Sequence, residues 1–208
     1  QGPASSAGGT PILPVMGTLS IPEAPAGTMD VVLQGEPDSS SGLQNLPIVA
    51  QNNTGGTVYS ASVRATGTAP DGSITTWVVG NLIPNTLEAG EWAFAELLLL
   101  DGVAVEGSTY TFEVTPTTVQ GSLYNLGLTL TGVATQAGAS EQVVGTATNE
   151  TGEPAFSPFK VQVMCFDAAG TTPTGVETDY IFVDEMAVGA SEDFSVKVDV
   201  ECPNYAVS

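Results

Sequence analysis

The 208-residue chain contains no histidine, and this absence excludes several kinds of catalytic and metal site at once. Ser-His-Asp and Cys-His nucleophilic sites and most zinc sites need an imidazole. The sequence also has no G-x-S-x-G, P-loop or G-x-G-x-x-G motif. Acidic pairs such as Asp184-Glu185 and Glu192-Asp193 could serve glycoside hydrolysis, but solvated loop acids explain them better in a chain with 23 acidic residues. We therefore expect a protein that is not an enzyme.

Basic residues are nearly absent as well. Arg64, Lys160 and Lys197 face 23 acidic residues, which gives a net charge of −20. Nucleic-acid binding depends on lysine and arginine contacts to phosphates, so we expect no nucleic-acid partner. No apolar run reaches the length of a membrane span, so we also expect no transmembrane segment.

Helical patterns are scarce too, whereas short stretches rich in Thr and Val recur between turns that contain Gly and Pro. Such spacing is typical of an all-β sandwich. When the chain is shifted by 97 residues, residues 30–56 align with 127–153 without a gap, and the match continues with small slips as far as Phe94 and Phe194. The sequence therefore predicts two tandem β-sandwich domains, at 28–124 and 125–208, after an extended N-terminal arm at 1–27.

The chain has only two cysteines, and both lie in the second copy. The stretches "FKVQVMCFD" and "FSVKVDVEC" alternate apolar and polar residues, which predicts two half-buried strands with Cys165 and Cys202 on their inward faces. The matching positions of the first copy are both glycine, Gly67 and Gly102. We predict a disulfide between Cys165 and Cys202, with two buried free thiols as the alternative.

The stretch "VMCFDAAG" in the second copy resembles the FxLYD domain, which is named for Phe-x-Leu-Tyr-Asp and often has a glycine a few residues on. Phe166 stands for the Tyr, Asp167 is the Asp and Gly170 closes the turn, while Val163 and Cys165 replace the Phe and Leu. The upstream "NETGEP" is similar to the family's Asn-containing turn, whereas the first copy retains only the Asp-Gly of "ATGTAPDG". The resemblance implies immunoglobulin-like sandwiches of prokaryotic surface proteins, in a family without a defined activity.

The stretch "FAELLLLDG" places four consecutive leucines where the second copy has the alternating "FSVKVDVEC". The match between the two stretches puts Leu97 and Leu99 at polar positions that should face water. Because exposed leucines favour aggregation, we expect something to cover this face. The alternatives are a local helix over "EAGEWAFAELLLLDG", or packing by the second copy or by the arm of the same chain.

The arm has no partner in the repeat, yet it is too apolar for a solvated linker. Its apolar residues are Ile12, Leu13, Val15, Met16, Leu19 and Ile21. We predict that the arm of one molecule adds a strand to the next and covers Leu97 and Leu99 there. Such head-to-tail contacts would build a homopolymer.

Calcium is the one metal that the acidic loops suggest, and no other cofactor is expected. Asp167, Asp179, Asp184 and Glu185 are weak candidate ligands at one end of the second copy, although no D-x-D-x-D-G loop is present.

Two N-x-T sequons place Asn52 and Asn149 on equivalent turns. They are candidate glycosylation sites in a host that glycosylates, with simple turn formation as the alternative. Trp77, Trp92 and Tyr180 could stack on sugars, with core positions for the two tryptophans as the alternative.

The stretch "QGPASSAGGTP" reads as the remainder of a processed secretory precursor, with a trimmed chain as the alternative. Together with the predicted disulfide it favours an extracellular or cell-surface location. We expect a structural subunit of a surface filament or sheath, assembled by strand addition from the N-terminal arm. The alternative is a surface-exposed binding or adhesion module that recognises a protein or glycan through its loops, and a third class is the accessory domain of a hydrolase.

Overall fold

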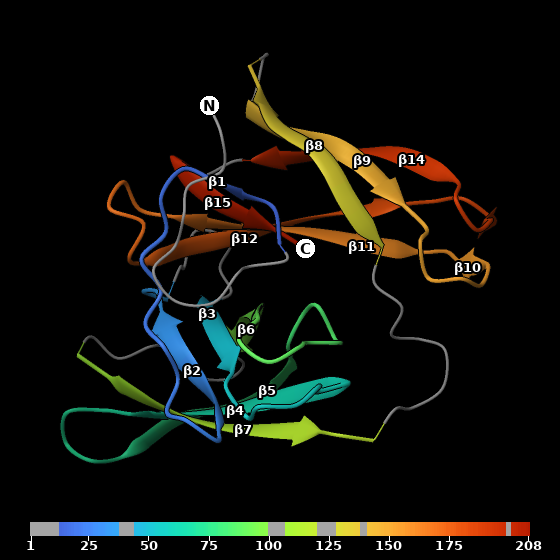
Figure 1. The fold of residues 1–208 in the computed structure, drawn as a ribbon. Helices are drawn as coiled ribbons and strands as arrows, with labels where there is room; N and C mark the ends of the chain where they lie inside the picture. Colours follow the sequence, from blue (N-terminus) through green and yellow to red (C-terminus); the bar gives the residue numbers. More distant parts are fainter. Residues whose placement is uncertain (1–12, 38–43, 100–106, 120–127, 138–140, 199–200) are drawn as a thin grey trace.

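The computed structural model describes residues 13–37, 44–99, 107–119, 128–137, 141–198 and 201–208, and these contain fifteen strands and no helix. The all-β class predicted from the sequence is confirmed. Figure 1 shows the strands in two groups, the lower from the first half of the chain and the upper from the second half together with the N-terminal strand β1. None of the described residues belongs to a helix that could cross a membrane.

The first half forms two antiparallel sheets of three strands, with the orders β2-β3-β6 and β5-β4-β7. Its last strand, β7, covers the stretch "TYTFEVTP", whose clean alternation is that of a strand. The strands are β2 (Met29–Gln34), β3 (Gln44–Asn52), β4 (Ser60–Thr68), β5 (Ile74–Asn81), β6 (Trp92–Leu99) and β7 (Thr109–Thr117).

The second half also forms two antiparallel sheets, with the orders β14-β9-β8 and β1-β15-β11-β12, and a small additional pair, β10-β13. The strand β1 (Val15–Met16) comes from the N-terminal arm and lies beside β15 (Figure 1). The remaining strands are β8 (Thr129–Gln136), β9 (Glu141–Thr148), β10 (Ala155–Phe156), β11 (Phe159–Phe166), β12 (Pro173–Ile181), β13 (Glu185–Met186), β14 (Ser191–Val198) and β15 (Asn204–Val207).

The strand order repeats between the halves once the arm strand is set aside. The sheet β2-β3-β6 corresponds to β8-β9-β14, and β5-β4-β7 corresponds to β12-β11-β15. Even an irregularity recurs, because the register shifts after Gly67 in β4 and after Cys165 in β11. The spacing that aligned the sequence therefore also aligns the strand order and its bulges.

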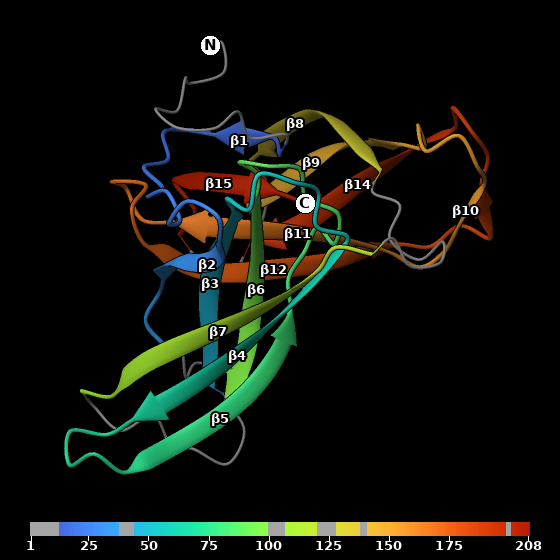
Figure 2. The same cartoon turned by 60° about the horizontal axis from the view of Figure 1, so that its bottom comes forward.

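Three apolar cores hold the structure together. One lies between the two sheets of each half, and the third lies between the halves. In Figure 2 the strands β3 and β6 run across β11 and β12, and the third core lies where these sheets meet. We call it the inter-half core; its buried members are Leu19, Val49, Trp92, Phe94, Met164, Phe166, Val176 and Ala206.

Three of the four consecutive leucines, at 97–99, lie in the strand β6, and their orientation is the reverse of the predicted one. The fourth, Leu100, lies outside the described residues. Leu97 and Leu99 point into the core of the first half and are only 1% and 3% exposed, whereas Leu98 faces outward. The predicted uncovered face with Leu97 and Leu99 is therefore wrong, and so is the alternative of a local helix. The sequence match made Phe94 equivalent to Phe194. The strand pairing makes it equivalent to Asp193, because Phe94 pairs with Val49 and Asp193 pairs with Thr146, the equivalent of Val49. A slip of one residue exchanges the two faces of a strand.

The strand β6 is nevertheless apolar on both faces, for a different reason. Ala93 and Ala95 pack inside the first half, whereas Trp92 and Phe94 point outward into the inter-half core. The second half therefore covers the outer face of this sheet, which is one of the alternatives that the sequence left open.

The strand β11 shows the same effect from the other side of the contact. Its inward face carries Val161, Val163 and Cys165, as predicted. Its outer face was predicted to be solvated, yet Gln162 and Met164 are buried. Because the first half covers this face, β11 is a central strand with two buried faces rather than a half-buried one.

Candidate functional site

The acidic residue Asp167 has a local structural role in the turn between β11 and β12. Its carboxylate accepts hydrogen bonds from the backbone N–H groups of Thr171 (2.8 Å) and Thr172 (3.2 Å). The hydrogen bond from the Thr171 backbone contributes most to lowering the pKa of Asp167 below its ordinary value. The carboxylate thus closes the turn.

The other predicted calcium ligands are dispersed. The Asp179 carboxylate accepts from the backbone N–H of Tyr180 (2.7 Å), Asp184 follows the end of β12, and Glu185 lies in β13. Within the described ranges, no three His, Cys, Asp or Glu residues are arranged to hold a metal ion. The structure does not bring these candidates together into a calcium site.

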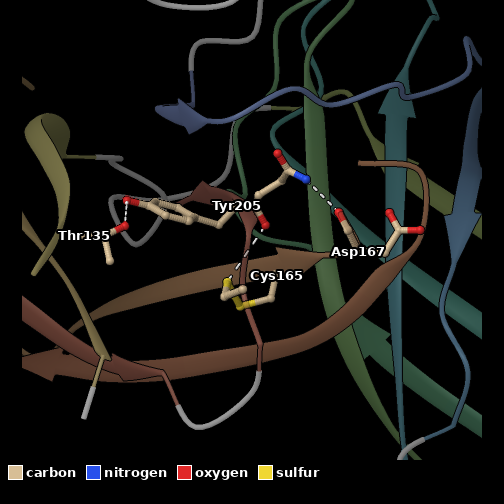
Figure 3. Close-up of a disulfide and its surroundings, with 6 residues drawn as sticks. Thr135, Cys165, Asp167 and Tyr205 are labelled. Carbon is tan, nitrogen blue, oxygen red and sulfur yellow. Dashed lines mark hydrogen bonds between the residues drawn. A yellow bond between two sulfur atoms is a disulfide. The ribbon is translucent and has the colours of Figure 1, made fainter. Parts of the chain in front are cut away.

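Cys165 and Cys202 form a disulfide in the core of the second half, with their Cα atoms 4.9 Å apart (Figure 3). The bond joins β11 to the segment just before β15, so Cys202 is inward, as predicted, but lies outside the strand β14, which ends at Val198. The bond closes a sequence separation of 37 residues, for which loop-closure entropy contributes about 4 kcal/mol. Beside it, the Tyr205 hydroxyl hydrogen-bonds the Thr135 hydroxyl at 3.0 Å, so this side of the core is tied to β8 (Figure 3). The disulfide fits an oxidising compartment.

The two sequon asparagines are buried. The side chains of Asn52 and Asn149 are both 0% exposed. The Asn149 amide donates to the carbonyls of Glu153 and Met186, both at 2.8 Å, while its oxygen accepts from the hydroxyl and the N–H of Thr151. Asn52 repeats the pattern with the carbonyls of Gly56 and Leu87.

These contacts decide between the two readings of the sequons. A glycosyl transfer needs the amide nitrogen, but in both turns that nitrogen is buried and already bound to two or more carbonyls. The prediction that Asn52 and Asn149 are exposed acceptors is therefore wrong for the folded protein. The turn-forming alternative holds. Asn52 ties the β3–β4 connection to the segment before β6, and Asn149 ties the β9–β10 connection to β13.

The N-terminal arm docks first on the second half of its own chain. The strand β1 pairs antiparallel with β15, with Val15 opposite Ala206 and Met16 opposite Tyr205. The Asn204 side chain accepts from the Thr18 N–H (3.0 Å) and donates to the Asp167 carbonyl (2.7 Å), so it links the arm to the β11–β12 turn.

A second anchor holds the arm to the first half, just before β2. The Gln51 side chain accepts from the Ala24 N–H (2.8 Å), and the Asn53 side chain donates to the Ala24 carbonyl (2.6 Å). The arm therefore bridges the two halves, and both anchors are within one chain.

The arm residues that were predicted to form an assembly interface differ in burial. Leu19 is buried in the inter-half core, and Leu13, Val15 and Ile21 pack against it. Met16 is more exposed, and Ile12 lies outside the described residues. The arm thus covers the seam between the halves and not the leucine stretch of β6.

A cavity of about 340 Å³ opens in the second half between the end of β12 and β14. Tyr180 and Phe182 stand at it as an exposed pair, with ring centres 5.9 Å apart. Of the aromatic residues that the sequence singled out for sugar stacking, Trp92 is in the inter-half core, and the side chain of Trp77 lies outside the described part of the chain. Tyr180 is the one that the structure places at a cavity.

Several residues that matter here were not singled out from the sequence. Asn204 and Gln51 anchor the arm through contacts distant in sequence, for which no local pattern exists. The alternation of large and small residues in "WAFA" was, by contrast, a signal that both faces of β6 are buried.

Comparison with other proteins assigns the chain to no family. No model of a known protein family matches the chain, and no curated protein matches it either.

Proposed function

We propose that this chain is a non-enzymatic structural protein of the extracellular surface, built as two immunoglobulin-like sandwiches that assemble through the N-terminal arm. The observation that carries the proposal is the pairing of β1 with the edge of β15, together with the burial of Leu19 between the halves. A short strand that completes the edge of another sheet is the element used in strand addition.

The same arm contacts can form within one chain or between two. If the arm of one molecule docks on β15 of the next, every hydrogen bond of β1, Thr18 and Ser20 is preserved. The segment between the two anchors, residues 21–23, is short, and short hinges favour exchange between molecules. Repeated exchange is head-to-tail and yields an open polymer.

The chemistry of the chain supports a passive and extracellular role. The buried disulfide suits an oxidising compartment, and the net charge of −20 suits an exposed, soluble surface. The acidic residues with a shifted pKa have structural explanations. The Asp71 and Asp167 carboxylates accept hydrogen bonds from the backbone of their own turns, which lowers their pKa, and burial raises the pKa of Glu91.

Electron microscopy tests the proposal directly. The full chain is imaged by negative stain beside a variant that lacks residues 1–21 but keeps the anchor at Ala24. We expect filaments or sheets from the full chain and single particles from the shortened one. Adding a synthetic peptide of residues 11–23 to the shortened chain should give a one-to-one complex, because the vacated edge of β15 accepts the arm in trans.

Two results would contradict the proposal. Single particles from the full chain at every concentration would show that the arm serves only its own molecule. Polymers from the shortened chain would show that another surface assembles it.

A further inference from the structure

The two halves differ at one corner where their shared strand order predicts the same contact. In the first half, Ile83 and Phe94 exchange two backbone hydrogen bonds, of 2.9 and 2.8 Å, and so close the corner between β5 and β6. The equivalent residues of the second half are Phe182 and Asp193, as the pairing of β12 and β14 with their neighbours shows. Phe182 and Asp193, both described in the structure, form no such bridge.

The cavity of about 340 Å³ lies at this open corner. Its apolar residues include Val161, Ile181 and Phe194, which belong to the core of the second half. The edge strands β12 and β14 flank it, each from a different sheet. An edge strand has backbone donors and acceptors available for a further strand. The corner thus offers apolar contact together with two open strand edges.

The rim combines aromatic rings with carboxylates. Phe182 is 75% exposed and Tyr180 is 45% exposed, and their rings contact each other. Asp179, Glu192 and Asp193 also line the cavity, and none of its ten lining residues is basic. Adjacent aromatic faces and carboxylates attract ammonium and guanidinium groups, by cation–π and ionic interactions.

We propose that this corner binds an extended segment of another protein that carries lysine or arginine. The segment would lie along the open edges, its cationic side chain over Tyr180 and Phe182 and beside Asp193. A second copy of this chain is a poor source of such a segment, because it has only three basic residues among 208, one of which, Arg64, is already paired with Glu113. The charge of −20 would also draw a cationic partner to the surface.

This site is independent of the arm. The arm occupies the β15 edge of the sheet, whereas the proposed segment would occupy β12, at the opposite edge. Loss of binding at the corner should therefore leave any assembly by the arm unchanged.

Binding is tested with fluorescein-labelled extended peptides on the full chain. The probe is a hexapeptide of alternating valine and lysine, and the matched peptide replaces lysine by norleucine. We expect saturable fluorescence anisotropy for the lysine peptide, at least about tenfold weaker binding of the norleucine peptide, and weaker binding in high salt. Phe182→Ala and Asp193→Asn should each weaken binding by about tenfold.

The control is Phe156→Ala, which removes another exposed aromatic ring, on β10, outside the residues that line the cavity. It should bind the lysine peptide as the original chain does. Equal binding by Phe182→Ala and Phe156→Ala would overturn the proposal, since the attraction would then come from the overall charge alone. Absence of binding, or binding of a neutral oligosaccharide such as chitotriose in place of the peptide, would overturn it as well.

Discussion

Phe94 and Asp193 occupy the same position in the two halves and face opposite environments. Phe94 lies opposite Val49 on β3, and Asp193 lies opposite Thr146 on β9, at matching points of the repeat. Phe94 is buried in the inter-half core, whereas Asp193 is exposed and accepts a hydrogen bond from the Thr146 hydroxyl at 2.9 Å. The outer face of one sheet is therefore a contact surface in the first half and a solvated surface in the second.

Exchanging residues between these matched positions should separate the halves. Phe94→Asp places a charge in the inter-half core, and we expect a loss of about 4 kcal/mol or more from the contact between the halves. The core of the first half does not include Phe94, so each half should stay folded. Small-angle scattering should then show a larger radius of gyration, and thermal unfolding should split into two transitions.

The matched control is Leu98→Lys. Lys197 is the equivalent of Leu98 in the second half, and Leu98 is already partly exposed. This variant should leave the scattering profile unchanged and alter stability by less than about 1 kcal/mol. If Phe94→Asp behaved in the same way, the inter-half core would not hold the halves together in solution.

Asn149→Asp should destabilise the second half despite its equal size. The replacement keeps the oxygen that accepts from Thr151 but turns the donor to Glu153 and Met186 into a second acceptor. Two carbonyls then face a buried carboxyl oxygen, and we expect a loss of about 3 kcal/mol in urea unfolding. Gln136→Ala, which removes an exposed amide on β8, serves as the control and should change stability by less than about 0.5 kcal/mol. A similar small change for both variants would show that Asn149 is not the anchor of its turn.

Glu91 should make the protein less stable as the pH rises. Its side chain is buried and one carboxylate oxygen has no hydrogen-bond partner among the described residues, so burial raises its pKa, against the opposing backbone hydrogen bond at Glu88. A folded pKa above the unfolded value gives a stabilising contribution that is present below the unfolded pKa and is lost as the pH rises through the folded one. Urea unfolding between about pH 4 and pH 7 should therefore show Glu91→Gln gaining stability relative to the original chain as the pH rises.

Asp71→Asn provides a control of opposite sign. The Ser73 hydroxyl and N–H donate to Asp71 and lower its pKa, so its contribution is present above the unfolded pKa and is lost as the pH falls through the folded one. Relative to the original chain, Asp71→Asn should therefore lose stability as the pH rises through the acidic range up to about pH 5, where the unfolded Asp titrates. Parallel pH profiles for the two variants would contradict both assignments.

Gly17→Ala should release the arm without unfolding either half. Gly17 has φ of +86°, and a Cβ there would collide with the Asn204 side chain that holds Thr18. Gly27 has a similar φ of +83° but open space around it, so Gly27→Ala has the same backbone strain and no collision. Hydrogen exchange at the Thr18 amide should become roughly tenfold faster or more in Gly17→Ala only. Equal exchange in both variants would show that the arm is not held by Asn204.

Much of the local structure could be predicted from the sequence because it rests on short-range chemistry. Alternation in "FSVKVDVEC" identified Phe194, Val196 and Val198 as inward residues, which the structure confirms. Alternation in this stretch and in "FKVQVMCFD" placed Cys202 and Cys165 in one core. The repeat offset identified equivalent turns, including those of Asn52 and Asn149. It could not show whether these amides face solvent, because each also donates to a carbonyl more than thirty residues away, that of Leu87 or Met186.

By itself, then, the sequence determined the all-β class, strands such as β7, β11 and β14, and the disulfide, since each follows from alternation, turn chemistry and the spacing of the repeat. Only the tertiary structure decided which outer faces are covered. A strand face that is buried against the other half and a face that binds a partner look alike in sequence, because both are apolar. In addition, a slip of one residue in the alignment of the two halves at Phe94 exchanged the predicted faces of β6. The place of the arm and the open corner at Phe182 were likewise decided by contacts between segments that no local pattern connects.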